Sequence, residues 1–158
     1  MDLLRKWKNA IHIIFTYRVY YLLKYRRRLW LFKQCSLVKK GTGKLNIMPE
    51  GSIHMMTDKG IKCWIQIEDQ GEFVVSGSLY LEGADIWILR KACLSMGSVF
   101  INKGSMIECA CHISIVDDCL IGRDVLIHDS DGHVIDNNPN EMTSPVVIED
   151  HVWICSRA

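Results

Sequence analysis

Residues 101–127 read INKGSMIECACHISIVDDCLIGRDVLI, and single isoleucines recur through this stretch at intervals of six residues. They are Ile101, Ile107 and Ile113, followed by Ile115, Ile121 and Ile127. Short polar turns, such as Asn-Lys-Gly-Ser at residues 102–105, separate them. Strands that each turn one aliphatic side chain inward every six residues can close a three-sided coil, and successive coils stack those side chains in columns. The stretch therefore predicts a parallel β-helix.

The remaining inward positions of such a coil should hold small residues. Ser105, Cys111, Cys119 and Val125 suit them. The two-residue step from Ile113 to Ile115 indicates that one coil is slightly longer than the next. The alternative is an antiparallel sandwich or meander, whose strands alternate with period two and are joined by hairpin turns. The six-residue interval favours the β-helix.

Length and composition fit one globular domain with a short appendage. The chain has 158 residues, of which 49% are hydrophobic and 23% charged, so a packed core is expected. The net charge of +1 hides an asymmetry, because residues 1–34 carry nine Lys and Arg against one acid, while the rest carries an excess of acids. The two parts of the chain therefore need separate explanations.

The first part has no Gly or Pro from residue 2 to residue 34, and its apolar residues recur near helical spacing. We predict a basic amphipathic helical segment over 1–36, a polar linker over 37–44 and the β-helix over 45–158. Basic and aromatic residues interleave in residues 1–34, as in proteins that dock on anionic membranes. The alternatives are an apolar stripe packed on the β-helix with solvated basic residues, or contact with nucleic acid. Arg26-Arg27-Arg28 alone does not indicate nucleic-acid binding.

The seven cysteines show neither CxxC pairs nor the Cys/His spacing of a zinc site. The longest uncharged run near the start, residues 9–17, is shorter than a membrane span and is followed by no cleavage signal. We therefore expect reduced, packed thiols and a cytoplasmic location, with contact at the inner face of the membrane as a further possibility.

The segment IGRDVLIHDSDGH at residues 121–133, followed by PVVIEDHVWI at residues 145–154, resembles the hexapeptide-repeat acyltransferases. More narrowly, it is similar to the O-acetyltransferases that modify surface polysaccharides and sugar precursors, which are related to the maltose and galactoside acetyltransferases. The resemblance covers roughly residues 45–158. It implies a left-handed parallel β-helix, a homotrimer, acetyl-CoA bound between neighbouring subunits, and transfer of the acetyl group to a sugar hydroxyl without a metal.

The same resemblance implies the residues of a site. His133 matches the catalytic histidine of the family, which accepts the proton of the hydroxyl. Asp129 and Asp131 are close enough in sequence to orient its ring, and Asn102 matches an active-site asparagine. Trp153 and Ser156 match the part that binds the acyl donor, although Trp153 can equally serve packing and Asn102 can be an ordinary turn residue.

The chain ends at residue 158 inside a rung, where the family continues through further coils, so we expect it to be incomplete at its carboxyl end. Cys155 also stands where the family usually has glycine. Three other functions stay open: a noncatalytic scaffold, a sugar N-acyltransferase with an amine acceptor, and a zinc hydratase resembling the γ-class carbonic anhydrases. His128 and His133 have the spacing of two ligands of that last class, but the chain has no histidine between His54 and His112 to serve as the third.

Overall fold

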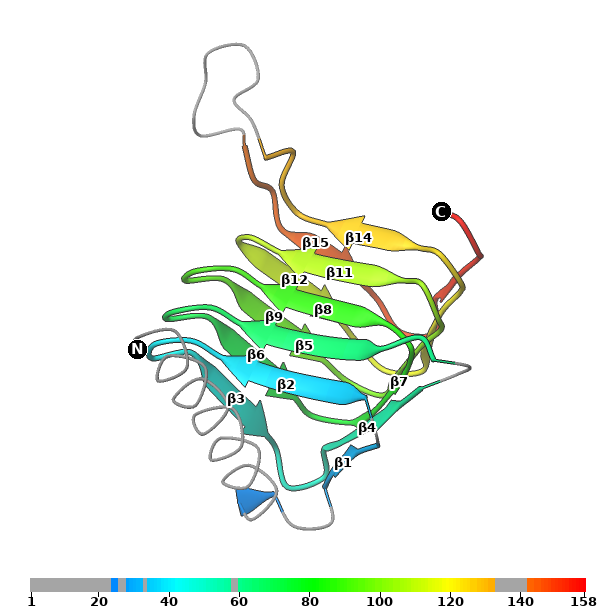
Figure 1. The fold of residues 1–158 in the computed structure, drawn as a ribbon. Coiled ribbons are helices and arrows are strands. Elements are labelled where there is room, and N and C mark those ends of the chain that lie inside the picture. Colours follow the sequence, from blue (N-terminus) through cyan, green and yellow to red (C-terminus); the bar gives the residue numbers. More distant parts are fainter. Residues whose placement is uncertain (1–23, 26–27, 33, 58–59, 133–141) are drawn as a thin grey trace, which may run out of the picture.

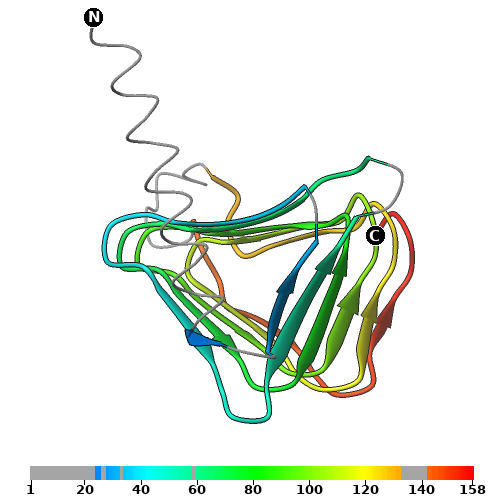
Figure 2. The same ribbon diagram turned by 60° about the horizontal axis from the view of Figure 1, so that its bottom comes forward.

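A computed structural model of the chain describes residues 24–25, 28–32, 34–57, 60–132 and 142–158. Its strands form three parallel sheets, and each strand pairs with the strand three places later in the chain. The chain therefore visits the sheets in turn and then begins the next coil, as a parallel β-helix does. Figure 2 shows the three sides of this coil, and Figure 1 shows the coils stacked along its axis. The predicted parallel β-helix is confirmed.

The strands are named by sheet. Sheet A holds β1 (Leu29–Leu31), β4 (Ser52–Met56), β7 (Ser78–Glu82), β10 (Val99–Ile101), β13 (Cys119–Ile121) and β16 (Trp153–Ile154). Sheet B holds β2 (Cys35–Lys39), β5 (Cys63–Ile67), β8 (Asp85–Ile88), β11 (Met106–Cys109) and β14 (Leu126–His128). Sheet C holds β3 (Lys44–Ile47), β6 (Glu72–Val75), β9 (Cys93–Met96), β12 (His112–Ile115) and β15 (Val146–Ile148). We call the turns from sheet A to sheet B corner AB, and those from sheet B to sheet C corner BC.

The core is the inside of the coil, because alternate residues of every strand point inward. All six isoleucines that predicted the fold are buried there. Leu79, Val99 and Cys119 are partners in consecutive strands of sheet A, so the coils from β7 to β13 are 20 residues long rather than the 18 that three six-residue units give. The surplus lies in sheet B, where Ser105 and Cys109 flank Ile107 and all three are buried.

The expectation that one coil is longer than the next is therefore wrong for these coils. Ile113 and Ile115 lie on the same strand, β12, and both point inward, so their two-residue step is ordinary strand alternation. Of the four small residues expected inside, Ser105, Cys119 and Val125 are buried. Cys111 is exposed at corner BC, which is a correction.

The first coil begins before the predicted boundary at residue 45. β1 and β2 occupy 29–31 and 35–39, so neither the helical segment to residue 36 nor the linker over 37–44 extends as predicted. Cys35 and Leu37 are buried in alternation, and β2 pairs with β5 along five residues. Pairing with a neighbouring strand outweighs local helical preference here. The predicted helix over residues 1–23 lies outside the described residues.

Tyr25 and Arg28 hold the start of the chain to this first coil. The Tyr25 hydroxyl donates a hydrogen bond to the Leu45 carbonyl at 2.5 Å. The Arg28 guanidinium donates to the carbonyls of Ile47 and Met48 at 3.2 and 2.7 Å. Arg28, one of the basic residues that suggested a membrane surface, therefore has a structural partner. Within the described ranges, no helix has the length and apolar character needed to span a membrane.

One outward column of sheet A is apolar along all six strands. Its members are register partners from strand to strand: Trp30, His54, Tyr80, Phe100, Leu120 and Trp153. The rings of Trp30 and His54 stack with centroids 4.2 Å apart, and those of His54 and Tyr80 stack at 4.5 Å. Burial lowers the pKa of His54, which keeps its ring neutral within the stack. We call this row the sheet A column.

Candidate functional site

The chain leaves the coil once at corner BC, between β14 and β15. In the preceding coil this corner needs only residues 110 and 111, whereas here it takes residues 129–145. The two limbs of the excursion pair with each other: Ser130 and Thr143 form an antiparallel bridge. The amides of Asp131 and Ser144 donate to the carbonyls of Met142 and Asp129 at 3.2 and 3.0 Å. Figure 1 shows the described parts of the two limbs leaving the coil next to β14 and β15.

The base of the excursion encloses a pocket of about 280 Å³. It is lined by His128, Asp129, Ser130, Asp131, Met142, Ser144, Pro145 and Val146. The first limb supplies an imidazole, a hydroxyl and carboxylates, while Met142, Pro145 and Val146 supply an apolar wall. A polar wall facing an apolar one is a common form for the site of a small polar ligand.

His133, the residue predicted to be the base, lies outside the described residues. The pocket brings together the two predicted orienting residues, Asp129 and Asp131, which flank it on the same limb. Asp131 is exposed, and its backbone amide holds the opposite limb. The Asp131 side chain is therefore not held in place by packing in the core.

Asp129 is buried at 4% exposure and its carboxylate is fully engaged by backbone. It accepts hydrogen bonds from the amides of Ala110, Cys111 and His112 at 2.6, 2.8 and 2.6 Å. Three successive N–H groups that converge on one anion form a nest, which satisfies donors that a tight corner leaves unpaired. In this structure Asp129 ties its coil to the coil before it, a role that the sequence did not indicate.

His128 is the imidazole that the structure places in the pocket, whereas the sequence pattern indicated it only for the carbonic-anhydrase alternative. It lies on β14, where Ile127 points inward and its neighbours point outward, and it is exposed. Its Nδ1 lies 2.6 Å from the Ser130 carbonyl oxygen. The inward–outward alternation around Ile127 was the signal that could have placed His128 on the surface beside the excursion.

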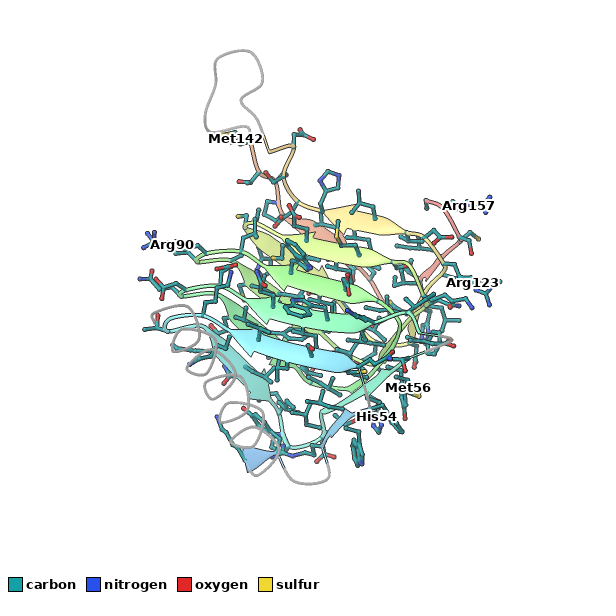
Figure 3. The ribbon with its side chains drawn as sticks, viewed as in Figure 1. His54, Met56, Arg90, Arg123, Met142 and Arg157 are labelled. Carbon is teal, nitrogen blue, oxygen red and sulfur yellow. The ribbon has the colours of Figure 1, made fainter. Side chains whose placement is uncertain are left out.

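Asn102, Trp153 and Ser156 are not beside this pocket. Asn102 and Ser156 lie at corner AB, and Trp153 lies in sheet A, where it is 71% exposed. The Asn102 Oδ1 accepts a hydrogen bond from the Lys103 amide at 2.9 Å, and the Ser156 Oγ accepts one from the Arg123 amide at 3.1 Å. Both side chains therefore stabilise turns. Figure 3 shows Arg123 of corner AB and Met142 of the excursion on opposite sides of the coil.

A second pocket, of about 390 Å³, lies along corner AB. It is lined by Ile61, Lys62, Gly83, Asp85, Gly104, Ser105, Met106, Asp124, Val125 and Leu126. Burial raises the pKa of Asp85 in this pocket. Ser156, predicted to bind the acyl donor, and Asn102, predicted to lie in the active site, both belong to this corner, whereas Asp129 and Asp131 lie at corner BC.

Comparison with protein-family models, with curated proteins and with solved structures finds no match for this chain. Among the described residues, no group of three or more His, Cys, Asp or Glu side chains could hold a metal ion. The assignment of a function must therefore come from the coil, the excursion and its pocket.

Proposed function

We propose that this protein is an acyltransferase of the left-handed β-helix class, which moves the acetyl group of acetyl-CoA to a hydroxyl of a sugar or surface-polysaccharide precursor. The observation that carries the proposal is the excursion at corner BC. It interrupts an otherwise regular parallel coil at the segment that contains His133, and it encloses a pocket with one polar and one apolar wall. A pyranose has the same division, with hydroxyls at its edge and C–H groups on its faces.

In this proposal His133 acts as general base. A sugar hydroxyl is a weak nucleophile at neutral pH, and an imidazole titrates in the range where it can accept the hydroxyl proton. The hydroxyl oxygen attacks the thioester carbonyl carbon as that proton moves to the imidazole. When the tetrahedral intermediate collapses, the C–S bond breaks and the same proton passes to the departing thiolate. Backbone N–H groups or the Asn102 amide are candidates to stabilise the oxyanion.

We further propose that the active unit is a homotrimer, in which corner AB of one subunit approaches the excursion of the next. Two features support this arrangement. The donor residues Trp153 and Ser156 are separated from the pocket within one chain. The sheet A column is mostly aromatic and aliphatic over six strands, and His54 is its one ionisable residue apart from Tyr80. Burial lowers the pKa of His54, so electrostatic repulsion does not oppose contact between two copies at this column.

The test is acetyl transfer from acetyl-CoA to a panel of methyl glycosides, followed by mass spectrometry, with the mass of the assembly measured by light scattering. We expect His133→Ala to lower kcat by about 10³-fold while the far-ultraviolet spectrum is unchanged. His151→Ala is the matched control, because His151 is exposed on the turn before β16, where its ring lies 3.5 Å from the carboxylate of the exposed Asp118. Wild-type activity in His133→Ala would refute the assigned base, and no transfer by the wild type would favour a noncatalytic scaffold.

A further inference from the structure

The contact between His128 and Ser130 determines which nitrogen of the His128 ring carries the proton. A carbonyl oxygen can only accept a hydrogen bond, so the Nδ1 that lies 2.6 Å from the Ser130 carbonyl must be the donor. In the neutral ring the Nε2 atom then has no proton and keeps its lone pair. The main chain of the excursion thus prepares His128 as a hydrogen-bond acceptor.

The other polar groups of the pocket offer different chemistry. The Asp129 carboxylate is occupied by three backbone amides. The Ser130 hydroxyl accepts a hydrogen bond from the Gly132 amide at 3.1 Å. His128 lines the same pocket with an exposed ring, and the second limb and β15 add Met142, Pro145 and Val146 to the lining.

We propose that His128 is a specificity-determining residue, whose Nε2 accepts a hydrogen bond from a second hydroxyl of the acceptor, one that is not acylated. The inference rests on the proposed acetyl transfer and deepens it, because it restricts the acceptor to polyols. A hydroxyl bound to Nε2 is held at the polar wall, and the C–H face of the same molecule lies against the apolar wall. A monohydroxylic alcohol cannot form this second hydrogen bond and leaves water at Nε2, so it should bind more weakly than a polyol.

Two variants distinguish the proposed contact of Nε2 with the acceptor from the hydrogen bond of Nδ1 to the Ser130 carbonyl. In His128→Asn, the amide N–H can replace Nδ1–H at the Ser130 carbonyl, but nothing reaches the position of Nε2. In His128→Gln, the longer side chain can place its carbonyl oxygen near the position of Nε2, but the bond to Ser130 is lost. A residue that only holds the excursion would tolerate Asn and not Gln. A residue that contacts the acceptor would instead tolerate Gln and not Asn.

The experiment compares both variants with the wild type on methyl glucopyranoside and methyl galactopyranoside and on their monodeoxy analogues. We expect the KM of the best acceptor to rise about 10-fold in His128→Asn, as the loss of one hydrogen bond predicts, with the KM of acetyl-CoA unchanged. His128→Gln should recover most of that loss. For one monodeoxy analogue, the wild type should have a raised KM, and His128→Asn should raise that KM no further. The hydroxyl missing from this analogue is then the one that Nε2 binds.

The outcomes separate this inference from the proposed function. If the wild type transfers acetyl groups and His128→Asn keeps its KM and its preference among deoxy analogues, the inference is wrong and the function stands. If the wild type transfers none, saturation-transfer NMR with the same glycosides gives a second readout. Binding that is lost in His128→Asn would then support the inference and refute the transferase, and binding that is equal in both proteins would refute the inference as well.

Discussion

Replacing Asp129 by alanine should destabilise the fold more than any other change at the excursion. The side chain is 4% exposed, and its two oxygens accept three backbone hydrogen bonds of 2.6 to 2.8 Å. Hydrogen bonds to a charged group contribute roughly 1.5–3 kcal/mol each when their loss leaves the donors buried. The donors at corner BC are only partly buried, so water replaces part of each bond. We expect Asp129→Ala to lower the free energy of unfolding by about 3 kcal/mol.

Two further variants make this prediction specific. Asp129→Asn keeps one acceptor oxygen and turns an amide toward a backbone N–H, so it should lose about half as much, about 1.5 kcal/mol. Asp131→Ala removes a carboxylate from the same limb that is exposed, and it should stay within about 0.5 kcal/mol of the wild type. The assay is urea unfolding followed by far-ultraviolet circular dichroism. Equal stabilities of Asp129→Ala and Asp131→Ala would refute the role assigned to the nest.

Other features of the coil lead to further expectations. Burial raises the pKa of the Cys63 and Cys109 thiols to about 12, so in the folded protein they should resist alkylation at pH 8, while the exposed Cys111 reacts quickly. Because the same thiols ionise near pH 9 when unfolded, their contribution to the free energy of unfolding should be constant below that pH and fall as the pH rises from 9 toward 12. Urea titrations at several pH values would measure this fall. Ile107→Ala removes a fully buried side chain and should lower the free energy of unfolding by about 3 kcal/mol. Leu126→Ala, at a half-exposed position, should lower it by less than about 0.5 kcal/mol. Similar losses for the two variants would contradict the assignment of inward and outward positions.

The fold was predictable because aliphatic side chains mark the inside of the coil directly. The length of the coil was not predictable, because sheet B has a third inward residue, Cys109, which was not among the small residues expected inside. The start of the coil at Leu29 was hidden by the surrounding basic residues and by the lack of Gly and Pro. In that region the decisive interactions are made with strands 24 to 28 residues later in the chain.

The sequence predicted where the candidate site lies better than it predicted which contacts its side chains make. The resemblance predicted Asp129 and Asp131 to belong to one site, and the structure places both beside the same pocket. It could not show that the Asp129 carboxylate meets the amides of Ala110, Cys111 and His112, because stacking of successive coils creates that contact. Nor could it show the bond from His128 to the Ser130 carbonyl, which depends on how the chain turns after β14.

The excursion also makes the protein a suitable platform for grafting. Partners in sheet A are 20 residues apart in the middle coils but 33 apart across the excursion, as in the pair Leu120 and Trp153, and the strands on either side remain in register. All the surplus is absorbed at one corner, where extra length costs only closure entropy, about 0.6 kcal/mol for each doubling. A foreign peptide could therefore be spliced between residues 132 and 142 without repacking the coil, and libraries of such inserts would sample new ligands on one constant scaffold.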